Sequence, residues 1–232
     1  MNITKYKLFE DFMLQNMKDS AHDSHHIYRV LYTALDIASY EENVNYDVLI
    51  CACLLHDIGR TEQFKNSSLC HAAVGADKAY HFLMVQGYDN VYAERVKSCI
   101  KSHRYRADAP PVSLEAKILF DADKIDVTGT IGIARTLIYQ GHICEPLYTL
   151  REDGTVSGGE GDEEPSFFKE YKYKLEGIYT KFFTKRGQEL ALERQKSAID
   201  FYENMKKEVK TTYSTGEKLL AKNLEDFSNK SN

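Results

Sequence analysis

The sequence has little of several features that mark whole classes of protein. Its 232 residues contain no internal repeat, and no apolar run approaches the ~20 residues needed to cross a bilayer. There are 30 lysines and arginines against 35 aspartates and glutamates, a net charge of −5, whereas proteins that bind nucleic-acid polymers usually carry a basic field. We therefore expect neither a membrane protein nor a nucleic-acid binder. A small phosphorylated substrate stays compatible with this charge, because a bound metal supplies positive charge locally.

Cysteines are also few, and they form no recognisable framework. The five cysteines are an odd number at irregular spacing, and four of them lie in or beside apolar helical patterns. This distribution favours reduced thiols in a core over disulfides. The residues Met1 to Lys5 lack the basic-then-apolar pattern of a secretory signal. We expect a cytoplasmic protein.

Apolar residues recur at helical spacing through most of the chain. They repeat at three- and four-residue steps over 27–37, and the segment 48–58 is almost continuously apolar. Similar patterns predict further helices over 72–85, 91–103, 113–126, 128–139, 168–182 and 190–209. All four prolines fall between these segments. The fold class predicted is all-α.

The expected organisation is a single helical bundle over 1–209, followed by a polar, frayed tail over 210–232. Residues 22–126 would carry a metal site, and the helices of 167–209 would pack on that part. The segment 152–166 is rich in glycine and acidic residues and has no periodicity. It predicts a mobile loop, either a linker or a lid.

The sharpest candidate for chemistry is the pair His56 and Asp57, at the end of the apolar segment 48–58. An isolated carboxylate costs several kcal/mol to bury, so an aspartate here should be paired or metal-bound. Neighbouring helical residues point about 100° apart, which lets both side chains reach one ion. The dipeptide is weak evidence by itself, because a histidine is favoured near a helix C-terminus in any case.

Other segments offer similar side chains near a helix end. His26 starts the helix predicted over 27–37, and His103 extends the apolar face of the helix over 91–103. Asp123 and Asp126, three residues apart, share one helical face. Asp121 competes with Asp123 for the role of ligand, and we expect it to be a solvated acid or one that hydrogen-bonds a ligand.

The ordered set His26, His56, Asp57 and Asp123 resembles the signature of the HD-domain metal-dependent phosphohydrolase superfamily. The resemblance depends on five short sequence motifs: His26–Val30, Leu54–Arg60, Asp121–Asp126, His71–Ala76 and Gly132–Arg135. The last two are similar to compact bacterial single-domain members, and the likeness spans about residues 5–209. It implies one divalent metal ion held by the four residues. The ion would be Mn²⁺, Fe²⁺, Ni²⁺, Zn²⁺ or Mg²⁺, and Mn²⁺ is our first choice. Imidazole and carboxylate ligands suit the transition metals in this group better than they suit an all-oxygen Ca²⁺ site.

Members similar to this subgroup split nucleoside or deoxynucleoside triphosphates into monophosphate and pyrophosphate. The resemblance therefore implies a metal-dependent hydrolase that acts on a nucleotide, and it is compatible with a homodimer. A phosphomonoesterase or phosphodiesterase of the same fold is the nearest alternative. A non-catalytic nucleotide sensor and a di-iron oxygenase of HD type are two further ones.

The remaining roles follow from this reaction. Asp57 would orient the attacking water, and Asp126 would be either a water-positioning base, which we favour, or an acceptor for a ligand histidine. His71 and His103 are predicted to contact substrate phosphate, a second metal ion and a structural role being the alternatives. The remaining candidates lie close to these residues. Four cations surround His103 and would form either a phosphate clamp or a solvated face: Lys97, Lys101, Arg104 and Arg106. Arg29 and Lys124 lie beside ligands and are predicted to bind substrate, and His22 with Asp23 would be a polar pair beside His26.

Overall fold

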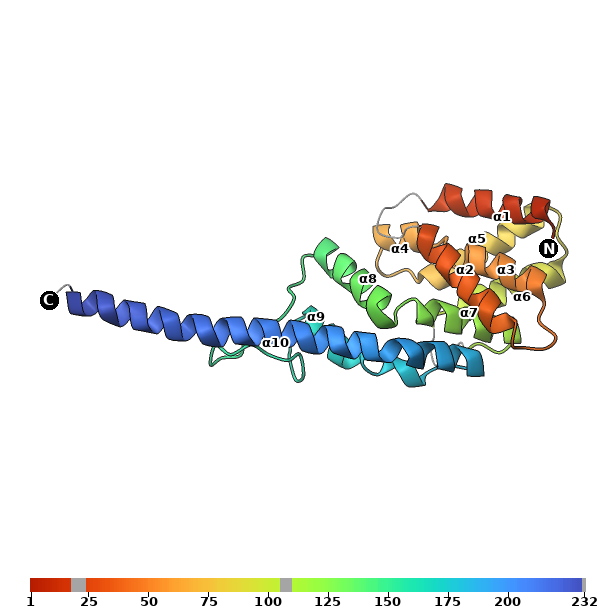
Figure 1. Ribbon diagram of the computed structural model, residues 1–232. Coiled ribbons are helices and arrows are strands. Elements are labelled where there is room, and N and C mark those ends of the chain that lie inside the picture. The colour runs from red at the N-terminus through yellow and green to blue at the C-terminus, as the bar shows by residue number, and fades with distance from the viewer. Residues whose placement is uncertain (18–23, 105–109, 231–232) are drawn as a thin grey trace. The chain divides into compact units, whose positions relative to one another are not determined.

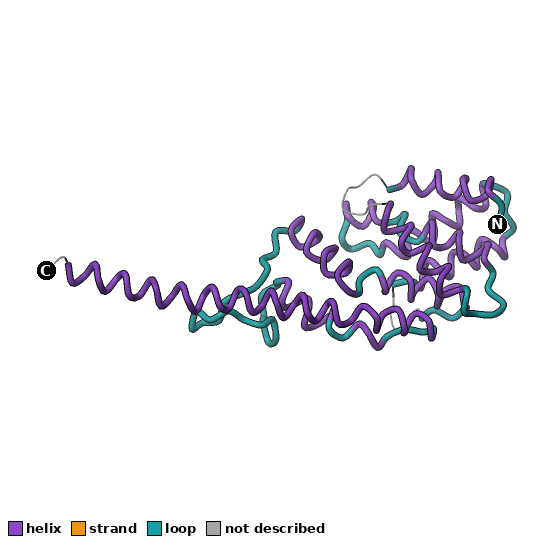
Figure 2. Tube along the Cα trace, viewed as in Figure 1, coloured by secondary structure: helices purple, strands orange, loops and turns teal. Residues whose placement is uncertain are grey.

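The protein is helical, as its apolar periodicity predicts. The computed structural model describes residues 1–17, 24–104 and 110–230, with side chains to residue 224. Within these ranges the backbone forms helices and loops but no strand, as Figure 2 shows, and the only β-pairing is an isolated bridge between Leu150 and Val156. The all-α prediction is confirmed. None of the helices described is both long and apolar enough to cross a membrane.

The chain folds into two compact units, where the sequence predicted one bundle. Residues 1–127 and 180–193 make up the first unit, and residues 128–179 and 194–232 make up the second. The helices of the first unit are α1 (Ile3–Asn16), α2 (Ser24–Ala38), α3 (Tyr46–Leu55), α4 (Arg60–Lys65), α5 (His71–Val85), α6 (Asn90–Ser102), α7 (Leu114–Ile125) and the first turns of α10 (Lys185–Lys230) (Figure 1).

Helix α3 is the centre of the first unit. It is apolar on every side, and its residues from Cys51 to Leu55 are fully buried, as expected of a helix that other helices surround. Helices α1, α2, α5, α6 and α7 all pack against it. Asn45 begins α3 by accepting a hydrogen bond from the backbone of Val48, and His56 ends it. The buried end of the central helix therefore carries a histidine.

A close approach between Gly59 and Gly75 brings His71 to the buried end of α3, where His56 lies. A Cβ atom on Gly59 would lie 2.3 Å from the carbonyl oxygen of His71 and 2.6 Å from the backbone nitrogen of Gly75. Only glycine fits at that distance. The turn that follows α3 thus lies directly against the first turn of α5.

The second unit departs further from the prediction. It contains α8 (Gly129–His142), α9 (Phe167–Glu170), a π-helical turn (Tyr171–Leu175), a 3₁₀ turn that begins at Ile178, and most of α10. The predicted helix over 168–182 is therefore broken into short turns. Within it, Tyr171 stacks on Tyr202 of α10 with 4.0 Å between ring centroids. Helix α10 continues to Lys230, so the segment predicted to be frayed is helical as far as that residue.

The segment 152–166 is a folded loop within the second unit. Thr149 and Ser157 both donate hydrogen bonds to the carboxylate of Asp162. Gly159 has a positive φ of 89°, and a Cβ atom there would lie 2.2 Å from the carbonyl oxygen of Phe168. These contacts hold the loop against α9 and argue against the prediction that it is mobile.

Candidate metal centre

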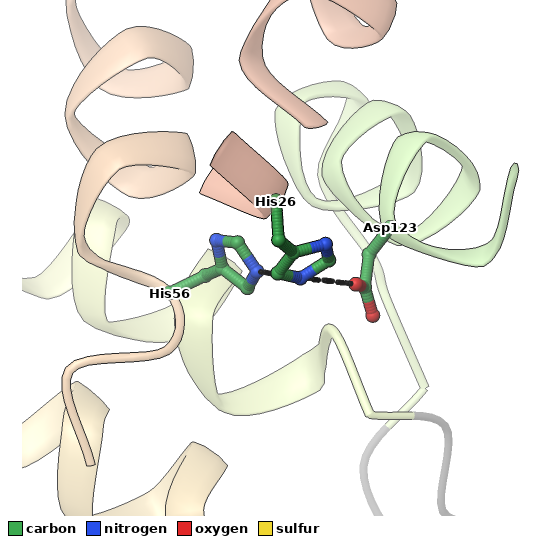
Figure 3. A group of neighbouring side chains, drawn as sticks. All are labelled: His26, His56 and Asp123. Carbon is green, nitrogen blue, oxygen red and sulfur yellow. Dashed lines mark hydrogen bonds and ion pairs between the residues drawn. The ribbon is translucent and has the colours of Figure 1, made fainter. Parts of the chain in front are cut away.

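His26 lies in the first turn of α2, and its ring is oriented by a carboxylate from α7. Its Nδ1 donates to Oδ2 of Asp126 at 2.7 Å, and the same carboxylate accepts two hydrogen bonds from Arg29, at 2.7 and 3.0 Å. The other ring nitrogen, Nε2, then faces Oδ1 of Asp123 at 3.3 Å and Nε2 of His56 at 3.4 Å (Figure 3). Because Asp126 holds Nδ1, Nε2 is the ring nitrogen that faces these groups.

His56 is held in the same manner by the end of its own helix. Its Nδ1 donates to the carbonyl oxygen of Cys53 at 2.7 Å, and its ring is fully buried. Its Nε2 lies 3.9 Å from Oδ1 of Asp123, completing a group in which His26, His56 and Asp123 offer ligand atoms within 4.8 Å of one another. Three helices, α2, α3 and α7, supply this group.

Asp57 lies between this group and a second one. Its Oδ2 is 3.6 Å from Nε2 of His26, and its Oδ1 is 3.6 Å from Nε2 of His71 and 3.5 Å from Nε2 of His103. Asp57, His71 and His103 are all buried, and they form the second cluster of potential metal ligands within the described part of the chain. Gln63 accepts from Nδ1 of His71 at 2.7 Å, and the carbonyl oxygen of Ile100 accepts from Nδ1 of His103 at 2.6 Å.

The chemistry of these donors fits a divalent cation. Both oxygens of Asp57 and the Nε2 atoms of His71 and His103 are buried and have no hydrogen-bond partner within the residues described. Buried polar atoms are nearly always satisfied, so such a cluster calls for an ion or a ligand. Four imidazoles whose second nitrogen is already held, together with carboxylates, are typical of transition-metal sites. His26, His56 and Asp123 could hold one ion, and Asp57, His71 and His103 could hold a second.

Four side chains of the site differ in the direction in which their pKa values are shifted. Although burial opposes it, the carboxylates of Asp123, Asp126 and Asp57 raise the pKa of His26 to about 10. Burial lowers the pKa of His56 to about 4 and, aided by Arg60, that of His71 to about 3. Burial alone would raise the pKa of Asp57, but Arg60 and the histidines hold it well below its usual range. At neutral pH the site therefore combines ionised carboxylates with neutral His56 and His71.

Two predicted roles on α2 and α7 look different in the structure. Both oxygens of Asp126 are engaged, one by Arg29 and the other by His26 and Arg29. This geometry favours the alternative in which Asp126 orients a ligand histidine over the water-positioning base that we preferred. Arg29, predicted to bind substrate, is half-buried and anchors that carboxylate.

The other predicted cations have varied surroundings. Lys101 is exposed in the last turn of α6, and Arg104 is exposed just after His103, where its charge contributes to the lowered pKa of His71. Lys124 is half-buried with its Nζ 4.2 Å from the ring centroid of Phe120. Residues His22, Asp23 and Arg106 lie outside the described residues.

Sequence reasoning missed two residues that touch the site from α4. The Nε atom of Arg60 lies 3.0 Å from Oδ1 of Asp57, and Gln63 holds the ring of His71. Their positions, three and six residues after Asp57, could have indicated that they lie near the site, because α4 begins soon after the His56–Asp57 turn. The sequence also misjudged Asp121, which is fully buried and bonded to the backbone of Phe183 and Thr184, so it is not solvated.

Residues 24–128 match the model of the HD domain family, and they contain every ligand described above. The all-α fold of this part is the HD-domain fold, which the chain shares with HD-superfamily hydrolases.

Among relatives, the chain is similar to the uncharacterised protein YpgQ of Bacillus subtilis, with 27% identity over 199 residues, which cover 83% of this chain and 86% of YpgQ. The crystal structure of YpgQ in complex with ADP has a TM-score of 0.68 and 24% identity, covering 88% of this chain and 97% of that one. A predicted HD superfamily hydrolase from an uncultured Thermotogales bacterium is 27% identical, with a TM-score of 0.59 and coverage of 90% and 99%.

Proposed function

We propose that this protein is a metal-dependent hydrolase of nucleotides, which converts a nucleoside or deoxynucleoside triphosphate into a monophosphate and pyrophosphate. The observation that carries the proposal is the buried carboxylate of Asp57, which four histidine Nε2 atoms surround at 3.5–3.8 Å and whose Oδ1 lies 3.0 Å from Nε of Arg60. The complex of YpgQ with ADP supports a nucleotide as the ligand.

His26, His56, Asp57 and Asp123 would hold the metal ion, for which Mn²⁺ is our first choice. When bound, a divalent ion offsets the charge of phosphate oxygens and brings the pKa of a water molecule towards neutrality. Asp57 is the residue placed to orient that water, because it lies between the two groups of histidines. Asp126 and Arg29 keep the ring of His26 in place, so His26 presents Nε2 throughout the reaction.

The second group extends the same chemistry to the substrate. His71 and His103 are held with Nε2 toward Oδ1 of Asp57, and the guanidinium of Arg60 lies at the same oxygen. These residues can contact phosphate oxygens or bind a second cation there, and the positive charge of Arg60 favours a trianionic or tetra-anionic chain in either case. Hydrolysis then joins a water oxygen to the α-phosphorus and breaks its bond to the oxygen that leaves with pyrophosphate.

The proposal is tested by product analysis. The purified protein is incubated with a panel of ribo- and deoxyribonucleoside mono-, di- and triphosphates in Mn²⁺, and the products are separated by ion exchange. We expect monophosphate and pyrophosphate in equal amounts, and no reaction in EDTA. Inorganic phosphate as the sole product would indicate a phosphomonoesterase instead. Saturable nucleotide binding without turnover would indicate a sensor, and either result would overturn the pyrophosphohydrolase assignment.

A further inference from the structure

The face of α4 that contacts the site continues beyond the residues already described. Arg60 touches Oδ1 of Asp57, and three residues later Gln63 accepts from His71. Phe64 is the next residue, four positions after Arg60. Positions i, i+3 and i+4 share one face of a helix. The aromatic ring of Phe64 therefore belongs to the face of α4 whose other two members reach the cluster around Asp57.

Phe64 is also accessible from solvent. It is 58% exposed, in contrast to the fully buried Phe9 and Phe167. A helical side chain leans toward the N-terminal turn of its own helix, which for Phe64 is the turn of Arg60. A lone exposed phenylalanine needs no explanation. One that shares a face with a guanidinium and an amide, both in contact with metal-ligand candidates, is placed to contact whatever those groups bind.

We propose that Phe64 stacks on the nucleobase of the substrate while Arg60 faces its phosphates, an inference that rests on the proposed function. Arg60 and Phe64 lie one helical turn apart, which separates a charged contact from an apolar one along the same ligand. An aromatic ring stacks on any base, because every base has a π-face. Phe64 would thus select nucleotides over inorganic polyphosphates without selecting one base.

The first experiment separates the base from the phosphates. Wild type and Phe64→Ala are compared for the KM of a nucleoside triphosphate and for the inhibition constant of inorganic triphosphate, which lacks a base. We expect Phe64→Ala to raise KM about 10-fold, the usual scale of base–aromatic stacking, with kcat nearly unchanged. The inhibition constant of inorganic triphosphate should stay the same, and Phe64→Tyr should restore the KM of wild type.

The second experiment measures binding without turnover. The chain has no tryptophan, so Phe64→Trp introduces a single indole at the proposed base site. Nucleotide should quench its fluorescence, and inorganic triphosphate should not. Val85→Trp is the matched control: it is 67% exposed at the other end of α5 from His71, about 21 Å away at 1.5 Å per residue. Its fluorescence should not respond to either compound.

The outcomes distinguish this inference from the proposed function. Hydrolysis of nucleotides by wild type, with the same KM in Phe64→Ala, would overturn stacking and leave the pyrophosphohydrolase standing. Quenching of Phe64→Trp by nucleotide, with no hydrolysis by wild type, would support stacking and overturn the reaction. Equal weakening of nucleotide and inorganic triphosphate in Phe64→Ala would show that the ring only supports the fold of the site, and stacking would be overturned.

Discussion

Helix α7 carries two aspartates, two positions apart, whose surroundings differ completely. Asp123 faces His26 and His56 and, against the effect of burial, its hydrogen bond to His26 lowers its pKa below the ordinary range. Asp121 is fully buried on another side, where it accepts hydrogen bonds from the backbone and hydroxyl of Thr184. Burial there raises its pKa above the ordinary value. One acid is poised to bind a cation, and the other caps the start of α10.

The comparison shows that partners, rather than residue type, decide what a buried carboxylate does. At Asp123 the neighbours are the Nε2 atoms of His26 and His56, which can coordinate a cation together with the carboxylate. At Asp121 the neighbours are N–H and O–H donors that already satisfy both oxygens. The first arrangement can bind a cation. The second only holds the backbone of Phe183 and Thr184 in place, and we call it the Asp121 joint.

The largest effect is expected at Asp57, the group shared by the two histidine clusters. Asp57→Ala removes the carboxylate to which all four Nε2 atoms are directed, and with it the several kcal/mol that a metal ion supplies. We predict a loss of at least about 10³-fold in kcat/KM and of bound metal. Metal analysis and product assays measure both, and circular dichroism serves as a control for folding. A variant that retains metal and full activity would refute the site.

The comparison within α7 is sharpened by a pair of matched variants. Asp123→Asn should lower activity about 100-fold or more and weaken metal binding, since a ligand is lost. Asp121→Asn should instead lower the free energy of unfolding of the metal-free protein by about 1–3 kcal/mol, because an amide leaves the Thr184 and Phe183 donors poorly satisfied. Urea unfolding and metal titration are run on both. The same response from both variants would contradict the division of roles.

A smaller effect is expected where a carboxylate acts through a histidine. Asp126→Asn removes the negative charge that orients His26, and we predict a 10–100-fold loss of metal affinity, about the range for such partners. Arg29→Met should give part of that loss, because Arg29 anchors Asp126. Titration with Mn²⁺ measures the affinities. If Asp126 is a base that positions water, its replacement will lower kcat while metal affinity stays at the wild-type value.

The smallest effect concerns the joint around Asp121. A Cβ atom on Gly187 would lie 2.7 Å from Oδ2 of Asp121 and 2.7 Å from Oγ1 of Thr184, so Gly187→Ala should destabilise the fold by about 1–3 kcal/mol. Gly216→Ala is the control in the same helix: nothing lies within 4 Å, and alanine is the better helix former by about 0.5–1 kcal/mol. Thermal unfolding should shift in opposite directions. Equal shifts would show that the Asp121 joint is dispensable.

Part of this site was predictable because its signals are local. His56 and Asp57 interrupt a run of buried residues, and that anomaly is visible without any tertiary information. The first turn of α2 likewise indicates His26. The two oxygens of Asp126 could not be assigned in the same way, because their partners are about 100 residues away in the chain. The short helix α4 was missed because six residues give too little periodicity to detect.

The amino-acid sequence by itself determined the helical class, because helix periodicity is a property of neighbouring residues. It also singled out His26, His56, Asp57 and Asp123 as candidate ligands, through a polar break in an apolar run and a resemblance to the HD-domain family. Tertiary structure alone decided that four Nε2 atoms meet around one carboxylate, that Arg60 joins them, and that Asp121 leaves the site to cap α10. These facts depend on how helices distant in the chain pack, and side chains that never meet in an isolated segment acquire their chemistry only when that packing removes them from water.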